Sequence, residues 1–392
     1  MNDQSDDVLR NVIRKYFKRL SILITQIPFE VRRFLLPPYM LYNGFKSYLH
    51  IDPSGRLGFE IYRKKASRFS IKTRKTRNRV EQEIFGVLGH ENMFRISGTN
   101  TEIRGGILTC KDFVEKFGHQ LPKRATTLTF SKPGVTGPIE IGKEAEVKII
   151  NCGIYWMVGN RRYVKPIPFA WLFGNASYLN EIDPFLHSES DFYSSLFGRL
   201  YEIITRGYEE RVDKNTQLKV LEIYIKLIER VENEFKTQLA ITQADEYVFQ
   251  QLLIKYKFFL HPGAMLIEGQ PTLRGRVFRK PDFHVQVSEN EHIYVEIEPP
   301  FCKPFEESEL SSRLRGALKQ VSEWKDILIQ QVAGRENIRY LIIIGLLDDL
   351  IKEEKESLQA FNKAQEDLTV VTWDWVLESI DKIKRRMMSK LS

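Results

Sequence analysis

The segment from residue 281 to residue 298 constrains the fold of this chain most, because it sets acids within an alternating apolar pattern. Polar and apolar side chains alternate from Pro281 to Val287, and they alternate again from Ile293 to Glu298. Such alternation is typical of two half-buried β-strands. If the polar run 288–290 is the turn of a hairpin, the antiparallel register places Asp282 directly opposite Glu296.

Two carboxylates placed opposite each other, with Cβ atoms about 5 Å apart, destabilise a sheet unless a cation compensates them. Hard oxygen ligands suit Mg²⁺ or Mn²⁺, so we predict a divalent metal site at Asp282, Glu296 and Glu298. The alternative is that Asp282 caps a turn and the two glutamates line a solvated strand face. The apolar residues around the glutamates, and the proline pair 299–300 that ends the strand, favour the metal site.

Composition narrows the class of protein. The chain has 392 residues, of which 42% are hydrophobic and 28% charged, as in an ordinary globular protein with two or three domains. Three cysteines without a C-x-x-C pair predict neither a disulfide framework nor a zinc knuckle, and a reducing cytoplasm fits them. We expect no membrane segment and a cytoplasmic location, because no apolar run approaches the roughly 20 residues that span a bilayer.

Three familiar catalytic patterns lack support. The G-x-x-x-x-G-K match at 137–143 is followed by Glu144, which lacks the hydroxyl that a phosphate loop requires, and the residues after it alternate like a strand. No H-E-x-x-H and no G-x-S-x-G motif occurs. Zinc hydrolase and serine hydrolase chemistry are therefore not indicated.

Basic charge is concentrated near the N-terminus. Residues 1–150 hold 27 Lys and Arg against 15 Asp and Glu, whereas residues 151–392 hold 32 against 36. One run without any acid holds nine cations: Arg63, Lys64, Lys65, Arg68, Lys72, Arg74, Lys75, Arg77 and Arg79. Such a run favours contact with a nucleic-acid phosphate backbone. A solvated basic loop, or a surface for an acidic protein, is the alternative.

Three parts are expected along the chain. Residues 1–185 combine an opening helix, Val8–Thr25, with a β-rich region. The expected strands of that region are Leu57–Tyr62, Gly106–Cys110, Thr126–Phe130, Glu146–Asn151, Ile154–Val158 and Arg162–Pro166, the last two joined by a turn at 159–160. Residues 186–241 form a helical connector, with helices Ser188–Tyr208 and Thr216–Phe235.

Residues 242–392 form the third part and predict the element order αβββαβαβα. The segments are a helix ending at Leu260, a strand at Ala264–Glu268, the hairpin, a helix over Glu309–Val332, a strand at Tyr340–Leu346, a helix over Lys352–Ala364, a strand at Leu368–Trp373 and a closing helix, Trp375–Leu391. The apolar stripe of the Glu309–Val332 helix leaves Lys319 facing solvent and Gln320 at its edge.

This order resembles the PD-(D/E)XK nuclease superfamily, and residues 242–392 resemble the nuclease core of Shedu, a bacterial anti-phage defence family. The motifs that carry the resemblance are Glu246 with Gln250, Pro281-Asp282-Phe283, Val295-Glu296-Ile297-Glu298-Pro299-Pro300, Lys303-Pro304-Phe305, Ala317 with Gln320 and Trp324, Ile344-Gly345, and Val371-Thr372-Trp373-Asp374. The resemblance covers about two fifths of the chain. Residues 1–241 show no family resemblance, which agrees with the variable N-terminal regions of Shedu proteins.

The resemblance implies a mixed α/β, restriction-endonuclease-like core that cleaves DNA with Mg²⁺ or Mn²⁺. Glu298 departs from the superfamily pattern, which has Lys at this position, so Glu298 would ligate metal or activate water. Glu246 would orient the ligands or bind a second metal, while Lys303 and Gln320 are further candidate site residues. The resemblance also implies a homotetramer and a phage-derived trigger.

Two other functions remain open from the sequence. The core could be a nucleic-acid-binding module whose catalytic site has decayed through loss of the lysine. It could also serve assembly in a sensor or scaffold protein that binds a phage component.

Overall fold

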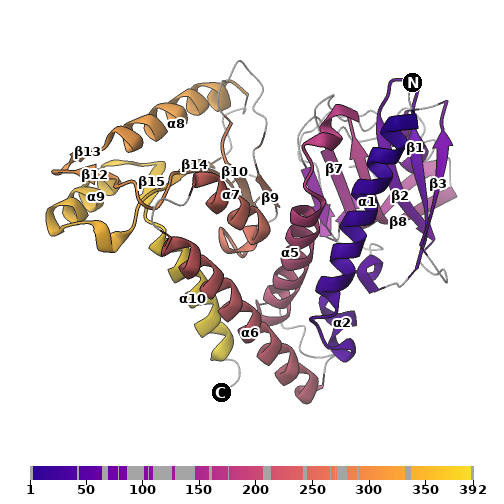
Figure 1. Ribbon diagram of the computed structural model, residues 1–392, viewed down its shortest axis with the longest axis horizontal. Coiled ribbons are helices and arrows are strands. Elements are labelled where there is room, and N and C mark those ends of the chain that lie inside the picture. The colour runs from indigo at the N-terminus through magenta and orange to yellow at the C-terminus, as the bar shows by residue number, and fades with distance from the viewer. Residues whose placement is uncertain are drawn as a thin grey trace. The chain divides into compact units, whose positions relative to one another are not determined.

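The computed structural model (Figure 1) describes the following ranges of the chain: 3–41, 44–63, 69–77, 79–85, 101–104, 106–108, 126–128, 146–158, 161–174, 176–205, 213–241, 245–264, 266–269, 271, 280–288, 291–331 and 337–389. It divides into two compact units, Met1–Ser195 and Leu196–Ser392. The expected three-part division stays a prediction. Within the described ranges, no helix is long and apolar enough to cross a membrane.

The N-terminal unit is built on a mixed sheet of eight strands. Its helices are α1 (Asp3–Ile24), α2 (Phe29–Leu35), η1 (Pro38–Leu41), α3 (Val80–Phe85), η3 (Ala176–Asn180) and α5 (Pro184–Thr205), the last of which continues into the C-terminal unit. Its strands are β1 (Lys46–Ile51), β2 (Leu57–Arg63), β3 (Ser70–Lys75), β4 (Thr101–Arg104), β5 (Gly106–Leu108), β6 (Thr126–Leu128), β7 (Glu146–Val158) and β8 (Arg161–Phe173). The strand order is β3-β1-β2-β8-β7-β5-β6, and β4 also pairs with β7.

Helix α1 covers one face of this sheet (Figure 1), as its amphipathic sequence predicts. Buried side chains recur every three or four residues along it, at Leu9, Ile13, Tyr16 and Leu20. The adjacent Phe17 ring lies 5.9 Å from the ring of Phe59 on β2, measured between centroids. Aromatic packing of this kind contributes more than its buried area alone.

The sequence prediction for the N-terminal unit is partly confirmed. The opening helix and strands are observed at β2, β5, β6, β7 and β8, but the two strands expected over Glu146–Val158 form one continuous strand. Strands β1, β3 and β4 were not expected. The turn predicted at 159–160 lies outside the described residues, as do Lys64, Lys65 and Arg68.

The C-terminal unit shows the predicted order αβββαβαβα. After α6 (Lys214–Leu239), the elements are α7 (Glu246–Lys255), η5 (Lys257–Phe259), β9 (Leu266–Gly269), β10 (Phe283–Ser288), β11 (Glu291–Ile297), β12 (Phe305–Glu306), β13 (Glu309–Leu310), α8 (Ser312–Gln331), β14 (Asn337–Ile343), η6 (Leu347–Asp349), α9 (Lys352–Ala364), β15 (Leu368–Val371) and α10 (Asp374–Met388). Except for η5, η6 and the short β12–β13 pair, these follow the order expected from the sequence.

The main sheet of this unit has the strand order β15-β14-β11-β10-β9. The β9–β10–β11 part is antiparallel, while β14 and β15 run parallel to β11. A parallel strand requires a crossover connection, and α8 and α9 supply the two crossovers. The fold is therefore a mixed α/β architecture.

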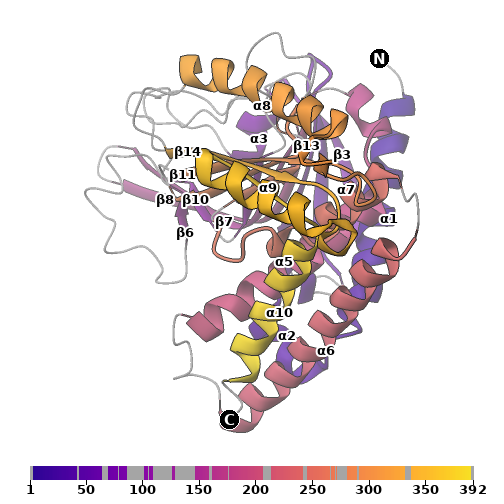
Figure 2. The same ribbon diagram turned by 90° about the vertical axis from the view of Figure 1, so that its left-hand side faces the viewer.

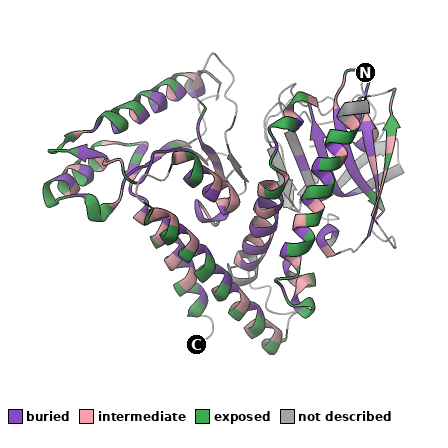
Figure 3. Ribbon diagram, in the orientation of Figure 1, coloured by how far each residue is buried: buried purple, intermediate pink, exposed green. Residues whose placement is uncertain are grey.

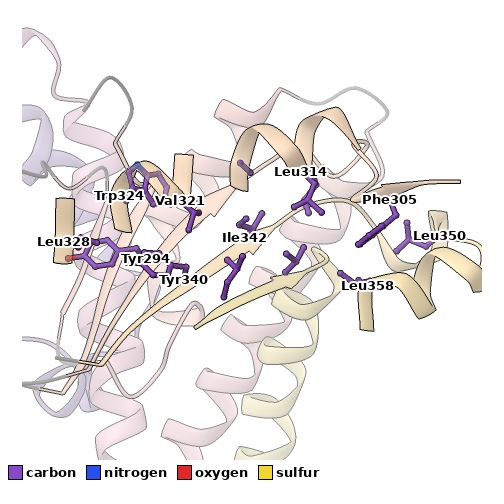
Figure 4. Close-up of a cluster of buried hydrophobic side chains, with 14 residues drawn as sticks. Tyr294, Phe305, Leu314, Val321, Trp324, Leu328, Tyr340, Ile342, Leu350 and Leu358 are labelled. Carbon is purple, nitrogen blue, oxygen red and sulfur yellow. The ribbon is translucent and has the colours of Figure 1, made fainter. Parts of the chain in front are cut away.

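Helix α8 and helix α9 pack on one face of the sheet through a single apolar cluster (Figure 4). Trp324 and Val321 of α8 lie over Tyr294 and Ile342 of the strands, and Leu358 of α9 joins the same cluster. The stripe expected along α8 is confirmed, since Leu314, Ala317, Val321, Trp324 and Leu328 are all buried. Figure 3 shows this burial as a purple side on α8 opposite a green outer side.

Helix α8 begins three residues later than expected, which corrects the range Glu309–Val332. Glu309 and Leu310 instead pair with Phe305 and Glu306 as a short hairpin. Ser311 then caps the helix, because its hydroxyl accepts a hydrogen bond from the backbone N–H of Leu314 at 3.1 Å.

Helices α6 and α10 run side by side in both Figure 1 and Figure 2. The buried side of α10 carries Val376, Ile380, Ile383 and Met387, at the spacing of one helix face. Asp213 caps α6 by accepting a hydrogen bond from Thr216 N–H at 3.0 Å. Residues 213–239 therefore contribute directly to the packing of the C-terminal unit.

We expect Gly345→Ala to destabilise the protein by about 3 kcal/mol. Gly345 has a φ of 72°, and an added Cβ would lie 2.8 Å from the carbonyl oxygen of Cys302. The matched control is Gly316→Ala on α8, where an added Cβ meets nothing within 4 Å. That change should stabilise by about 0.5–1 kcal/mol. Equilibrium urea unfolding measures both, and equal effects of the two variants would contradict the expectation.

Candidate active site

The hairpin register brings Asp282 and Glu296 together. Phe283 pairs with Val295, and the backbone N–H of Asp282 donates to the carbonyl oxygen of Val295 at 3.0 Å. Continuing this register by one residue sets Asp282 opposite Glu296, as the sequence predicted. Asp282 directly precedes β10 and Glu298 directly follows β11, so the predicted acids lie at one end of the hairpin.

The Asp282 carboxylate is held by two donors. Its Oδ1 accepts from Gln250 Nε2 of α7 at 2.6 Å, and its Oδ2 accepts from the backbone N–H of Ile297 at 2.9 Å. Asp282 is 8% exposed. Two donors on a buried carboxylate fix both its position and its orientation.

Glu296 is a buried acid with one unsatisfied carboxylate oxygen. Its side chain is 6% exposed, and its Oε2 atom is buried without a hydrogen-bond partner among the described residues. Leaving such an atom unsatisfied costs about 1–3 kcal/mol or more. A buried carboxylate oxygen in this state is a suitable ligand for a cation.

Glu298 is fixed through its backbone. Its N–H donates to the carbonyl oxygen of Ile343 on β14 at 2.8 Å, and its own carbonyl oxygen accepts from Trp373 Nε1 at 2.9 Å. The Trp373 ring in turn lies 4.8 Å from the ring of Phe249 on α7, measured between centroids. Strand β14, α7 and the start of α10 therefore all position the end of β11.

Burial and the charges of neighbouring acids raise the pKa values of Asp282 and Glu296. For Glu296, burial raises the pKa most, and the charges of Asp282, Glu298 and Glu246 raise it further. Burial also raises the pKa of Asp282, but the hydrogen bonds from Ile297 and Gln250 lower it in part. In the metal-free protein the opposed pair therefore retains a proton well above the range where carboxyls ordinarily ionise.

Arg313, at the start of α8, is a cation that approaches Glu298. Its Nη1 lies 3.6 Å from Glu298 Oε2, and the Arg313 side chain is 59% exposed while that of Glu298 is 7% exposed. The charge of Arg313 also acts on Cys302, whose pKa is raised chiefly by burial and lowered in part by Arg313. Arg313 is thus an exposed cation beside the buried Glu298.

The other predicted site residues lie in different surroundings. Glu246 is the first residue of α7, and its charge acts on Asp282 and on Glu296. Gln320 is buried on α8 at 8% exposure. Lys303 reaches Glu354 of α9, with Nζ and Oε2 3.3 Å apart, while Lys319 is exposed as expected.

Sequence reasoning left two residues out of the site, Gln250 and Arg313. Gln250 could have been found, because it lies one helical turn after Glu246 and therefore on the same face of α7. Arg313 gave no sequence signal of its own. Its place follows from the Ser311 cap, which starts α8 beside the end of β11.

Of the predicted acids, Asp282 and Glu296 are the pair that could hold a divalent cation. The described residues contain no group of three or more His, Cys, Asp or Glu side chains arranged to hold a metal ion. Mg²⁺ is commonly held by one or two carboxylates, with water and substrate phosphate completing its shell. Asp282 and Glu296 supply the two carboxylates that such a site uses, and the Oε2 atom of Glu296 is buried and unsatisfied.

The predicted nucleic-acid-binding residues belong to the N-terminal unit. Arg63 ends β2, Lys72, Arg74 and Lys75 lie on β3, and Arg77 and Arg79 follow it. All of these except Arg63, whose side chain is outside the described set, are exposed. The described part of the basic run thus lies partly on strands, and Arg77 and Arg79 lie outside them.

Comparison with known families identifies one region of the chain. Residues 232–377 match the family described as Shedu protein SduA, C-terminal. The match includes α7, the hairpin, α8, β14, α9 and β15. No curated protein matches the chain.

We expect metal-free protein to lose stability as the pH rises from acidic to alkaline. The folded state keeps a proton that the unfolded chain releases near the ordinary carboxyl pKa, so stability falls between that value and the raised pKa of Glu296. Glu296→Gln removes the ionisable group. At alkaline pH in EDTA its melting temperature should exceed that of the wild type by roughly 3 °C or more.

The control for this measurement is Glu323→Gln, which changes an exposed acid on α8. Its melting temperature should follow that of the wild type at every pH. A Glu296→Gln protein that melts below the wild type at alkaline pH would show that Glu296 stabilises the metal-free fold.

Proposed function

We propose that this chain, whose residues 232–377 belong to the SduA C-terminal family of Shedu proteins, is a metal-dependent DNA endonuclease that acts in anti-phage defence in the bacterial cytoplasm. The observation that carries the proposal is the buried pair Asp282–Glu296, with one carboxylate oxygen of Glu296 unsatisfied. The order αβββαβαβα and the mixed sheet support a restriction-endonuclease-like core.

Asp282 and Glu296 would hold Mg²⁺ or Mn²⁺, and Glu298 or Glu246 would complete or orient the ligand set. The bound metal would polarise the phosphodiester and lower the pKa of the attacking water. Gln250 keeps Asp282 in place through the 2.6 Å hydrogen bond to Oδ1, which is a positioning role. Glu298 would accept the proton of the attacking water, because an ionised carboxylate is a base. It cannot donate a hydrogen bond to the phosphate as a lysine would.

Arg313 would supply the positive charge that Glu298 cannot. Negative charge grows on the phosphate oxygens as water attacks, and a guanidinium matches these oxygens through two parallel N–H donors. The exposed Arg313 side chain is 3.6 Å from Glu298, and this contact supports a role for Arg313 at the site. Lys303 is a weaker candidate because it binds Glu354.

DNA would be held by the phosphate-binding cations of the N-terminal unit, from Arg63 to Arg79. Such contacts are insensitive to base sequence, so they would not by themselves select a target. Assembly as a homotetramer and activation by a phage-derived trigger are further parts of this proposal. They rest on the Shedu resemblance and on the family match.

A catalytically decayed DNA-binding module is the second candidate. The observation that favours it is Glu298, which stands where the superfamily commonly has lysine. In that case the acid cluster would persist without cleavage, and metal would stabilise the fold only.

We expect purified wild-type protein to nick or linearise plasmid DNA with Mg²⁺ or Mn²⁺ but not with EDTA. Glu296→Ala and Asp282→Ala should reduce cleavage by about 100-fold or more, because each removes a metal ligand. Glu323→Gln, an exposed acid on the same unit, should cleave at the wild-type rate.

DNA binding measured in EDTA should persist in both alanine variants. Metal-dependent cleavage that survives Glu296→Ala would place the chemistry elsewhere. Wild-type protein that binds DNA but never cleaves it would favour the decayed module.

Arg313→Ala should lower the cleavage rate by about 100-fold, whereas Arg313→Lys should retain part of the activity because the charge remains. The matched control is Arg315→Ala, two residues along the same helix and exposed. Single-turnover rates at saturating DNA separate this effect from weaker binding. A full rate in Arg313→Ala would assign the positive charge to another residue.

A further inference from the structure

Three planar side chains form one continuous stack on the N-terminal sheet. The Tyr48 ring of β1 lies 4.2 Å from the Tyr62 ring of β2, measured between centroids, with an angle of 11° between the planes. The guanidinium carbon of Arg74 on β3 lies 3.3 Å from the centroid of the Tyr48 ring. Because β2 and β3 flank β1 on opposite sides, Tyr62 and Arg74 cover opposite faces of Tyr48.

The stack lies on the sheet face that α1 does not cover. On β3, Thr73 is hydrogen-bonded to Asp6 of α1, at 2.9 Å between Thr73 Oγ1 and Asp6 Oδ2. Successive strand residues point to opposite faces, so Lys72 and Arg74 point away from α1. Both are exposed, and Tyr62 is 39% exposed.

The charge of this region is positive. Exposed cations lie along β3 and directly after it at Lys72, Arg74, Lys75, Arg77 and Arg79. Glu60, an acid of β2 on the same sheet face as Tyr62, is buried at 5% exposure and binds His50, with Oε1 and Nε2 3.0 Å apart. An anionic ligand would therefore meet cations at the surface and a carboxylate only beneath it.

We propose that the stack Arg74–Tyr48–Tyr62, with the neighbouring cations, binds single-stranded DNA. Unpaired bases can stack on aromatic rings and on guanidinium planes, whereas the bases of a duplex are already stacked on one another. Arg74 is an exposed member of the stack and lies on β3, at the edge of the described sheet. Bases would extend the stack beyond Arg74, while Lys72 would contact the phosphates.

This inference rests on the proposed DNA role and makes it more specific, by naming the form of DNA that the N-terminal unit recognises. Two other ligands would bind this surface through its charge alone, without stacking. A duplex would be held through its phosphates, and an acidic protein would be held through its carboxylates. Cations on an edge strand also discourage pairing with other chains, and this role too needs no stacking.

Arg74→Lys tests the inference most directly, because it keeps the charge and removes the planar group. Fluorescence anisotropy of the full-length protein in EDTA would compare a labelled oligo(dT) of about 12 nucleotides with a duplex of the same length. We expect Arg74→Lys and Tyr62→Ala each to weaken single-strand binding about tenfold and to leave duplex binding unchanged.

Lys72→Ala is the matched control for charge. It should weaken the binding of the single strand and of the duplex alike. It should also reduce the slope of log affinity against log salt concentration by about one. Circular dichroism and melting temperature check that each variant is folded, and Arg74→Lys carries the test if Tyr62→Ala is unstable.

The inference is overturned if Arg74→Lys binds single strands as the wild type does while Lys72→Ala binds them weakly. It is also overturned if the duplex binds more tightly than the single strand and loses affinity in the same variants. Because the assay contains no metal, its outcome is independent of cleavage, so failure here would leave the proposed nuclease untouched.

Discussion

The opposition of Asp282 and Glu296 is the constraint on which the C-terminal unit depends. The hairpin register that sets them opposite each other is fixed by the apolar face of the same strands, where Phe283, Val285 and Val295 are buried. A slip of one residue would turn every one of these side chains to the wrong face of the sheet. The fold therefore cannot separate the two acids without losing part of its core.

This arrangement explains why so many elements converge on the end of the hairpin. Trp373 binds the carbonyl oxygen of Glu298, and the backbone N–H of Trp373 donates to the carbonyl oxygen of Gly345 at 2.9 Å. Gly345 in turn lies so close to Cys302 that a side chain could not be accommodated. These contacts hold the end of β11 through groups that carry no charge.

Local patterns made the C-terminal unit predictable. Helix α9 is observed with the predicted bounds, Lys352–Ala364. It could be predicted because its apolar positions recur at helical spacing. Strand β3 was missed for the opposite reason. Ser70–Lys75 has a single aliphatic residue, Ile71, so its alternation carries no hydrophobic signal, and it becomes a strand by parallel pairing with β1.

Contacts between distant residues set the limit of sequence reasoning at the site. The position of Asp282 opposite Glu296 follows from a short hairpin turn, so it could be predicted from the sequence. The contact of Gln250 with Asp282 joins residues 32 positions apart, and that of Arg313 with Glu298 depends on where α8 begins. A hydroxyl cap at Ser311 decides that start, and the apolar stripe alone extended the helix too far.

In the proposed nuclease, the uneven distribution of charge would divide the work on DNA between two parts of the chain. Residues 151–392 have more acids than cations, and four acids lie at or near the active site, so this region repels phosphate before metal binds. Attraction must then come from residues 1–150, where cations outnumber acids. Screening limits such attraction to about 8–10 Å at physiological salt. In the proposed nuclease, the basic run would therefore raise the local concentration of DNA, but the choice of bond would be made by groups proposed to contact the phosphate, such as Arg313.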